Sequence, residues 1–379
     1  MISRIFQSLG YLCLLGALVS FFYYWDPTRI FFMGLKSKNS FAFEELPKEI
    51  TKYDIEKTLT LTSSSNLEDK RAQLRNSILG KQKLEDLRPY RQMRIYKQEF
   101  AEKYPAPICL FEPSVSTRMY CQLAAYKQWS NLDAIFELST DFDPAYIAKS
   151  FLFTPLKSNG HLVLYHHGYA GTFHQQKYFL EKLNEQGFTV IAFNMISYGD
   201  HPNNIPDPWM YAVNGKLDQV KHPQEVIFKP VFASLNHALD TQKIQHVHMM
   251  GLSAGGWVTA VSAALDPRIE KSYPIAGVLP IGLRHGDKER ASPQFYKPML
   301  ETASYLDMFA LAADRPGRSQ MQIFNRYDRC CFNNTRGKLY EDIVQNVTGG
   351  DFSVLIDETH ARHKISSWAF DKILKDLAQ

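Results

Sequence analysis

Residues 246–256 read HVHMMGLSAGG, and the prediction of the architecture is built on this segment. Its first five residues predict a short strand, and residues 257–265 continue as a helix. Ser253 therefore lies at a sharp strand-to-helix turn, where glycines are needed because side chains would clash with neighbouring elements. We interpret Ser253 as a nucleophile held in strained backbone geometry. The alternative is a glycine- and serine-rich turn without chemistry.

Short apolar segments alternate with helical ones from about residue 136 onward. This pattern is typical of a mostly parallel sheet with helices on both faces, in a single doubly wound α/β domain. The predicted strands are residues 146–153, 161–166, 189–194, 246–251, 272–279, 321–325 and 352–356. The predicted helices are residues 173–186, 226–239, 254–264 and 367–377.

The segment HHGYAG, residues 166–171, follows the predicted strand 161–165. Its glycines allow a close approach to a substrate, and backbone N–H groups are well suited to hold a carbonyl oxygen that becomes negatively charged. We assign the N–H groups of Tyr169 and Ala254 as the two donors of an oxyanion hole. His166 and His167 are interpreted as residues that hold this loop, in preference to proton transfer.

A serine hydroxyl needs a base to take its proton, and the base needs a carboxylate to hold its tautomer. Asp328 follows the predicted strand 321–325, at the edge where open α/β sheets place their sites. We favour Asp328 as the acid over a surface Asp paired with a neighbouring arginine. His360 and His363 both follow the last strand, and His363 is favoured because it lies just before the last helix; His360 is the alternative base.

These motifs together resemble those of the α/β-hydrolase superfamily over the last roughly 240 residues. HHGYAG resembles the oxyanion loop, GLSAGG the nucleophile elbow, NRYD the acid loop and HARHKIS the histidine loop. The resemblance implies a largely parallel sheet of about eight strands and a triad of Ser253, Asp328 and His363. A long separate lid is missing from the pattern, since only moderate insertions occur at residues 197–225 and 282–318.

The amino-terminal residues predict a different environment. Residues 9–25 carry no charge and end in aromatic side chains, which favours an uncleaved membrane anchor over a cleaved signal peptide or a buried helix. We therefore expect an anchor and linker at residues 1–38, a helical basic extension at 39–135 and a catalytic domain at 136–379. The expected location is the membrane, in either orientation, with a secreted or periplasmic protein as the alternative if the segment is cleaved.

The extension from residue 39 to 135 carries helical signals. Residues 65–68 fit a capping box, and Gly80 could end the helix that follows. Between residues 68 and 103 ten basic side chains face six acidic ones, and this difference of four equals the net charge of the whole chain, +4. We expect a solvated helix face here, with contact to anionic lipid as the alternative.

The composition is that of a folded globular protein, with 45% hydrophobic and 22% charged residues in 379. The small net charge gives no reason to expect a nucleic-acid partner. Five cysteines without zinc spacing predict no structural metal, and Cys330 and Cys331 are expected to be two packed thiols, with a vicinal disulfide as the alternative.

The predicted function is a membrane-anchored serine hydrolase of the carboxylesterase type that acts on a small-molecule or lipid-like acyl ester. Thioester and amide bonds are weaker alternatives. The expected mechanism uses an acyl enzyme and needs neither a metal nor an organic cofactor. Two other functions stay open: a catalytically silent scaffold, and an acyltransferase in which an alcohol replaces water.

Overall fold

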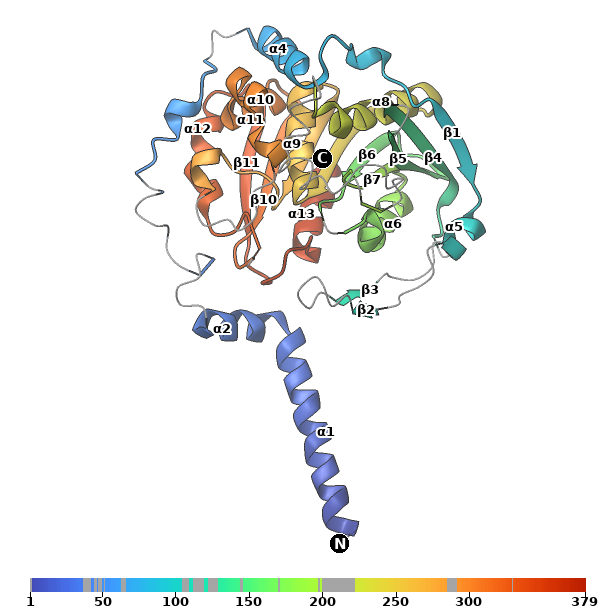
Figure 1. Ribbon diagram of the computed structural model, residues 1–379, viewed down its shortest axis with the longest axis vertical. Coiled ribbons are helices and arrows are strands. Elements are labelled where there is room, and N and C mark those ends of the chain that lie inside the picture. Colours follow the sequence, from blue (N-terminus) through green and yellow to red (C-terminus); the bar gives the residue numbers. More distant parts are fainter. Residues whose placement is uncertain are drawn as a thin grey trace.

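The computed structural model describes residues 2–36, 42–43, 46, 50, 52–62, 66–103, 109–111, 119–121, 129–143, 146–169, 171–196, 198–199, 222–284, 292–328 and 330–379. Within these residues, nine strands form one sheet in the order β1-β4-β5-β7-β6-β8-β9-β10-β11 (Figure 1). They are β1 (Arg91–Ile95), β4 (Leu132–Asp143), β5 (Tyr146–Pro155), β6 (His161–His166), β7 (Thr189–Phe193), β8 (His246–Leu252), β9 (Ile269–Ile275), β10 (Ser319–Asn325) and β11 (Asp351–Asp357). A separate pair joins β2 (Cys109–Phe111) to β3 (Met119–Cys121).

The main sheet is mostly parallel, as predicted. Strands β7, β6, β8, β9, β10 and β11 run in one direction, whereas β1, β4 and β5 add antiparallel pairs at one edge. The prediction of about eight strands is one short, and the seven predicted segments include neither β1 nor β4. β1 comes from the segment expected to be helical. Arg91–Ile95 is extended since it hydrogen-bonds along Ile135–Ser139 of β4, a long-range pairing that local sequence patterns do not reveal.

Helices cover both faces of the sheet (Figure 1). On one face α8 (Glu225–Thr241) contacts β4 and β5, and α9 (Ala254–Leu265) contacts β6, β8 and β9. On the other face α6 (Lys177–Glu185) packs against β5 and β7, and its Phe179 ring meets Phe370 of α13 (Ser367–Leu377). The remaining helices near the sheet are α10 (Lys297–Thr302), α11 (Tyr305–Ala312) and α12 (Glu341–Gln345).

The parallel strands end at a common edge of the sheet. β6, β8, β10 and β11 end at His166, Leu252, Asn325 and Asp357. Because parallel strands share their direction, the loops that follow these four strands meet at that edge. Each of the loops carries at least one of the predicted site residues.

The extension packs on the main body through its basic residues. Asn66 is the N-cap of helix α4 (Leu67–Leu79), and its side chain accepts from the Asp69 N–H, so the cap lies one residue later than the predicted box at 65–68. Gly80, with φ +64°, is the C-cap, as predicted. Arg71 of α4 is fully buried, pairs with Asp314 and donates to the carbonyl of Ala264. The expected solvated face is therefore wrong for Arg71, which ties the extension to the core. Helix α5 (Lys97–Lys103) follows β1 and buries Phe100.

Helix α1 (Ile2–Tyr24) projects from the body, and α2 (Asp26–Lys36) follows it (Figure 1). Among the described residues, no helix is both long and apolar enough to cross a membrane. The structure thus does not support the hydrophobic anchor expected at residues 9–25.

Candidate active site

Ser253 lies between β8 and α9, at the strand-to-helix turn that the sequence predicts. Its backbone has φ +59° and ψ −128°, in the left-handed half of conformational space that residues with side chains rarely adopt. The Ser253 N–H donates to the Ile275 carbonyl at 2.9 Å, and this bond helps hold the strained residue in place. Backbone strain of this kind persists only where the surrounding structure enforces it.

Two glycines make this turn sterically possible. A Cβ at Gly251 would lie 2.3 Å from the Gly255 carbonyl oxygen, and a Cβ at Gly255 would lie 2.0 Å from the His166 carbonyl oxygen. Both distances are far below van der Waals contact. Close backbone packing of the amino end of α9 against the ends of β8 and β6 therefore explains why glycine stands at positions 251 and 255.

The loop after β6 lies directly against Ser253. A Cβ at Gly168 would be 2.6 Å from the Ser253 Cβ and 3.2 Å from the Ala254 nitrogen. Tyr169 follows Gly168, so the two predicted oxyanion donors, the N–H groups of Tyr169 and Ala254, belong to segments in contact. Ala254 is the first residue of α9, and the N–H groups at a helix start lack intrahelical acceptors and favour negative charge.

His166 and His167 both contact the loop that carries them. The Tyr165 hydroxyl and His167 Nδ1 are 2.7 Å apart, and His166 Nδ1 lies 2.8 Å from the His167 carbonyl oxygen. Burial, with smaller contributions from the charges of His166 and His363, lowers the pKa of His167 to about 3. His167 is therefore neutral at pH 7, and these contacts fit the interpretation that both histidines hold the loop.

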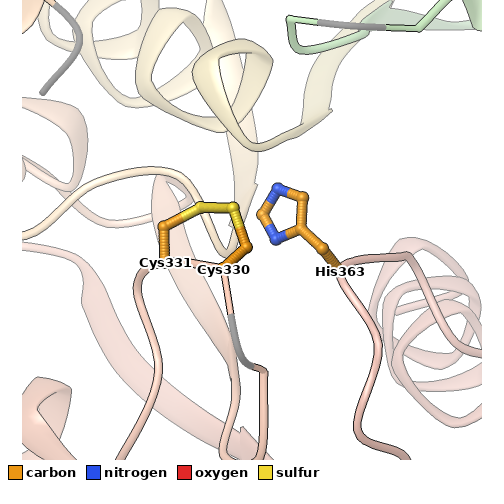
Figure 2. Close-up of side chains that lie close together, drawn as sticks. All are labelled: Cys330, Cys331 and His363. Carbon is orange, nitrogen blue, oxygen red and sulfur yellow. A yellow bond between two sulfur atoms is a disulfide. The ribbon is translucent and has the colours of Figure 1, made fainter. Parts of the chain in front are cut away.

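The predicted acid and base are brought together. Asp328, which is 1% exposed, places Oδ2 at 2.5 Å from His363 Nδ1, although the two residues are 35 positions apart. The remaining ring nitrogen of His363, Nε2, is buried and has no hydrogen-bond partner within the described residues, so the structure brings the acid and the base together but does not join Ser253 Oγ to the base by a hydrogen bond. Figure 2 shows the His363 ring beside the sulfur atoms of Cys330 and Cys331.

Asn325 at the end of β10 orients the loop of His363. Its side-chain amide donates to the Lys364 carbonyl at 2.9 Å and lies 3.4 Å from the Arg362 carbonyl. The two carbonyls flank His363 in the chain. Sequence reasoning did not identify Asn325, although it stands at the same strand end as the predicted acid.

His360, the alternative base, takes a different position. It is 1% exposed, and its Nε2 lies 3.3 Å from Asp357 Oδ2. Burial raises the pKa of Asp357, but hydrogen bonds with His360, Ser366 and Thr359 outweigh burial and bring it down to about 2. The His360–Asp357 pair is therefore a buried contact beside the loop, and the choice of His363 over His360 as the base stays a prediction.

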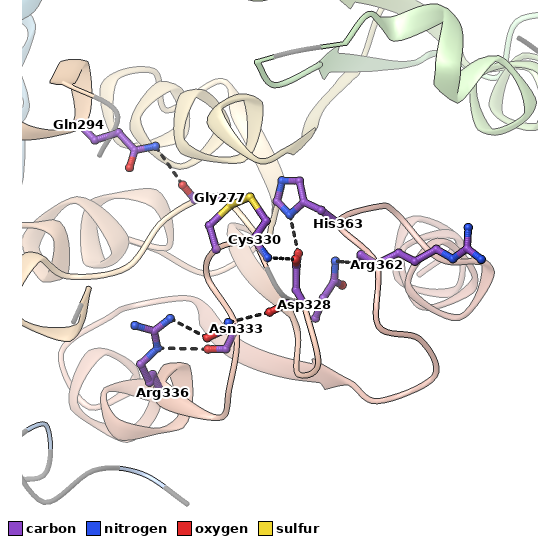
Figure 3. Close-up of a disulfide and its surroundings, with 10 residues drawn as sticks. Gly277, Gln294, Asp328, Cys330, Asn333, Arg336, Arg362 and His363 are labelled. Atoms are coloured by element: carbon purple, nitrogen blue, oxygen red, sulfur yellow. Dashed lines mark hydrogen bonds and ion pairs between the residues drawn. A yellow bond between two sulfur atoms is a disulfide. The ribbon is translucent and has the colours of Figure 1, made fainter. Parts of the chain in front are cut away.

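The expectation of two free thiols at Cys330 and Cys331 is wrong, because a disulfide joins them (Figure 2). The Cys330 N–H donates to Asp328 Oδ1 at 2.8 Å, and Asn333 donates to the Asp328 carbonyl at 2.6 Å (Figure 3). The disulfide loop thus holds the carboxylate that faces His363. The prediction of packed thiols relied on the fact that free cysteines are usually buried. That tendency does not indicate whether two adjacent cysteines in a tight turn form a disulfide.

Helix α2 contacts the loop that carries His363. Asp26, the first residue of α2, lies 3.5 Å from the Arg362 guanidinium and 3.6 Å from the Lys364 ammonium. Of the two predicted insertions, residues 197, 200–221 and 285–291 lie outside the described residues.

Comparisons with known proteins agree with this architecture. A family described as the alpha/beta hydrolase fold matches residues 161–272. Acetyl xylan esterase 1 from Thermoanaerobacterium sp. JW/SL YS485 is similar with a TM-score of 0.53 at 12% identity, covering 88% of this chain and 98% of its own. The acetyl xylan esterase from Paenibacillus sp. R4 has a TM-score of 0.55 at 13% identity, with 88% and 99% covered.

A third similar structure, methylesterase BT1017, has a TM-score of 0.58 at 13% identity and covers 87% of this chain and 67% of its own. A search of curated proteins finds no match. At these identities the comparisons establish the fold.

Proposed function

We propose that this chain, which has the α/β-hydrolase fold, is a serine hydrolase that cleaves a carboxylic ester. The observation that carries the proposal is the 2.5 Å contact between His363 Nδ1 and Asp328 Oδ2, at the sheet edge where Ser253 occupies a strained turn. A buried carboxylate fixes the Nδ1–H tautomer of the imidazole, which leaves Nε2 with a free lone pair. That lone pair is what a general base requires.

In the proposed mechanism, Ser253 Oγ attacks the ester carbonyl while His363 Nε2 accepts the hydroxyl proton. Asp328 stabilises the imidazolium and keeps its own charge throughout. The oxyanion is held by the N–H groups of Ala254 and Tyr169, whose segments meet at Gly168. His363 then donates its proton to the departing alkoxide, and water releases the acyl group by the reverse proton path.

The substrate is proposed to be a small-molecule ester with a short acyl group. Two of the structural neighbours are named acetyl xylan esterases, which makes acetate the first acyl group to test. No part of the proposed chemistry calls for a group outside this chain.

The test uses full-length protein, chromogenic esters of graded acyl length and a fluorophosphonate label. Ser253→Ala should abolish both turnover and labelling while leaving the thermal unfolding midpoint close to that of the wild type. Ser353→Ala, on strand β11, is the matched control and should keep both. Labelling that persists in Ser253→Ala would show that another residue is the nucleophile.

A further inference from the structure

Three side chains with soft or nitrogen ligand atoms converge beside the proposed active site. The sulfur atoms of Cys330 and Cys331 and a ring nitrogen of His363 all lie within 4.8 Å of one another (Figure 2). The two sulfurs are joined in a disulfide, Cys330 is partly exposed and Cys331 is buried. A reductant can therefore approach the pair from the side of Cys330.

We propose that reduction of the Cys330–Cys331 disulfide creates a binding site for a thiophilic divalent cation such as Zn²⁺, with His363 as the third ligand. A dithiol reductant supplies two electrons and two protons, so that the S–S bond is replaced by two thiols and the reductant becomes a disulfide. Zn²⁺ then displaces the two thiol protons to solvent and forms two Zn–S bonds and one Zn–N bond. No atom changes its oxidation state in this second step.

His363 is already arranged as a zinc ligand. Its Nδ1 faces Asp328, and its Nε2 is buried without a hydrogen-bond partner in the described part of the chain. Histidines that bind zinc commonly donate their other ring N–H to a carboxylate, which fixes the ring and raises its basicity. The contact that prepares His363 to accept a proton therefore also prepares it to bind a metal ion.

The loop geometry keeps both sulfurs near the ring after reduction. Asp328 accepts from the Cys330 N–H at 2.8 Å through Oδ1 and contacts His363 through Oδ2, so one carboxylate fixes both sides of the site (Figure 3). With Zn–S bonds of about 2.3 Å and Zn–N bonds of about 2.0–2.1 Å, tetrahedral coordination needs ligand atoms roughly 3.5–3.8 Å apart. The three ligand atoms already lie within 4.8 Å of one another, and the two sulfurs can separate once the S–S bond is broken.

Bound zinc would stop ester hydrolysis, and this consequence alone rests on the proposed function. A metal ion on Nε2 occupies the lone pair that takes the proton of Ser253. The oxidised protein offers no thiolates at positions 330 and 331 and should tolerate the same zinc concentration. The oxidation state of one disulfide would thus decide whether the enzyme is sensitive to zinc.

The binding test uses Co²⁺ as a spectroscopic probe. Full-length protein is reduced with dithiothreitol, freed of reductant without oxygen and titrated with Co²⁺; the oxidised protein is titrated in parallel. We expect thiolate-to-cobalt charge-transfer absorption that saturates at one equivalent in the reduced protein only, and that Zn²⁺ abolishes by displacement. Cys330→Ser, Cys331→Ser and His363→Gln should each weaken binding at least tenfold.

A double variant, Cys109→Ser with Cys121→Ser, and a separate Cys13→Ser variant are the matched controls and should bind Co²⁺ as the wild type does. Failure of the reduced wild type to develop the charge-transfer band would overturn the proposal. Unchanged affinity in His363→Gln would overturn the three-ligand site. In the activity arm, Zn²⁺ should inhibit only the reduced enzyme and a chelator should restore turnover. A protein without esterase activity would refute the proposed function but leave the cobalt result to decide the site.

Discussion

Replacement of Asp328 by asparagine tests the proposed triad most sharply, because the structure dictates how the new amide must lie. Asp328 is 1% exposed and accepts from the Cys330 N–H through Oδ1 and from His363 through Oδ2. The Cys330 N–H needs an oxygen acceptor, so the amide oxygen of the introduced side chain keeps the Oδ1 position. The amide NH₂ group then faces His363 Nδ1.

This orientation reverses the tautomer of His363. An NH₂ group donates, so Nδ1 becomes an acceptor and the ring proton moves to Nε2. A protonated Nε2 cannot take the proton of Ser253. We expect kcat to fall by about 10⁴-fold, the loss seen when the acid of a serine triad is exchanged for its amide. At about 1.4 kcal/mol per factor of ten, this corresponds to roughly 5.5 kcal/mol of barrier.

The assay is hydrolysis of a chromogenic acetate ester, with kcat and KM measured separately. Asp342→Asn, at an exposed position in α12, is the matched control and should hydrolyse the ester as the wild type does. The thermal unfolding midpoint of Asp328→Asn should stay close to that of the wild type, because the introduced side chain has nearly the same size and keeps both hydrogen-bond contacts, to the Cys330 N–H and to His363 Nδ1. A kcat within tenfold of the wild type would refute the assignment of Asp328 as the orienting acid.

Three further outcomes follow from the same geometry. Gly168→Ala places a Cβ 2.6 Å from the Cβ of Ser253. This variant should lower kcat at least about 100-fold in the ester assay, as loss of an oxyanion donor would. Full activity would mean that the loop after β6 does not contact the reacting atoms. His363→Ala should lower kcat by about 10⁶-fold with little loss of stability. His360→Ala should instead lower the free energy of unfolding by about 3 kcal/mol in urea, with kcat changed only a few-fold. The opposite pattern would exchange their roles. Burial, with smaller effects of Lys103 and His167, lowers the pKa of His174 to about 3, so the folded state resists its protonation and stability falls as the pH drops from about 6.5 toward 3. Relative to neutral pH this residue should cost about 2.7 kcal/mol at pH 4.5, and His174→Phe should flatten the decline in urea unfolding measured across that range; an unchanged slope would show that His174 is not responsible.

The sequence was sufficient for the segments that form the sheet edge of the site. The bounds predicted for β6 and α13 agree with the structure, and β8 ends one residue later than predicted. These elements were predictable because apolar runs end at glycine, serine or a capping residue, and those signals are local. The choice of Ser253, Asp328 and His363 relied on the same strand ends.

What the sequence could not provide depends on contacts between distant residues. Strand β4 carries acidic side chains that hid its strand character, yet Glu137 is buried and lies 2.9 Å from Lys149 on the neighbouring strand. The sequence alone does not show which acid lies beside each histidine. In the structure Asp357 contacts His360, and Asp328 contacts His363. The proposed division at residues 38 and 135 stays a prediction.

Strand β1 has a consequence for any shortened form of this protein. It is exposed, carries Arg91 and Arg94, and occupies the outer side of β4, whose Ile135 and Leu138 are fully buried. Charged outermost strands discourage one molecule from pairing with another through open backbone groups. A chain trimmed to begin at residue 132 would keep every proposed catalytic group and yet leave the outer backbone groups of β4 without a partner strand, so self-association would limit its solubility before any loss of chemistry became measurable.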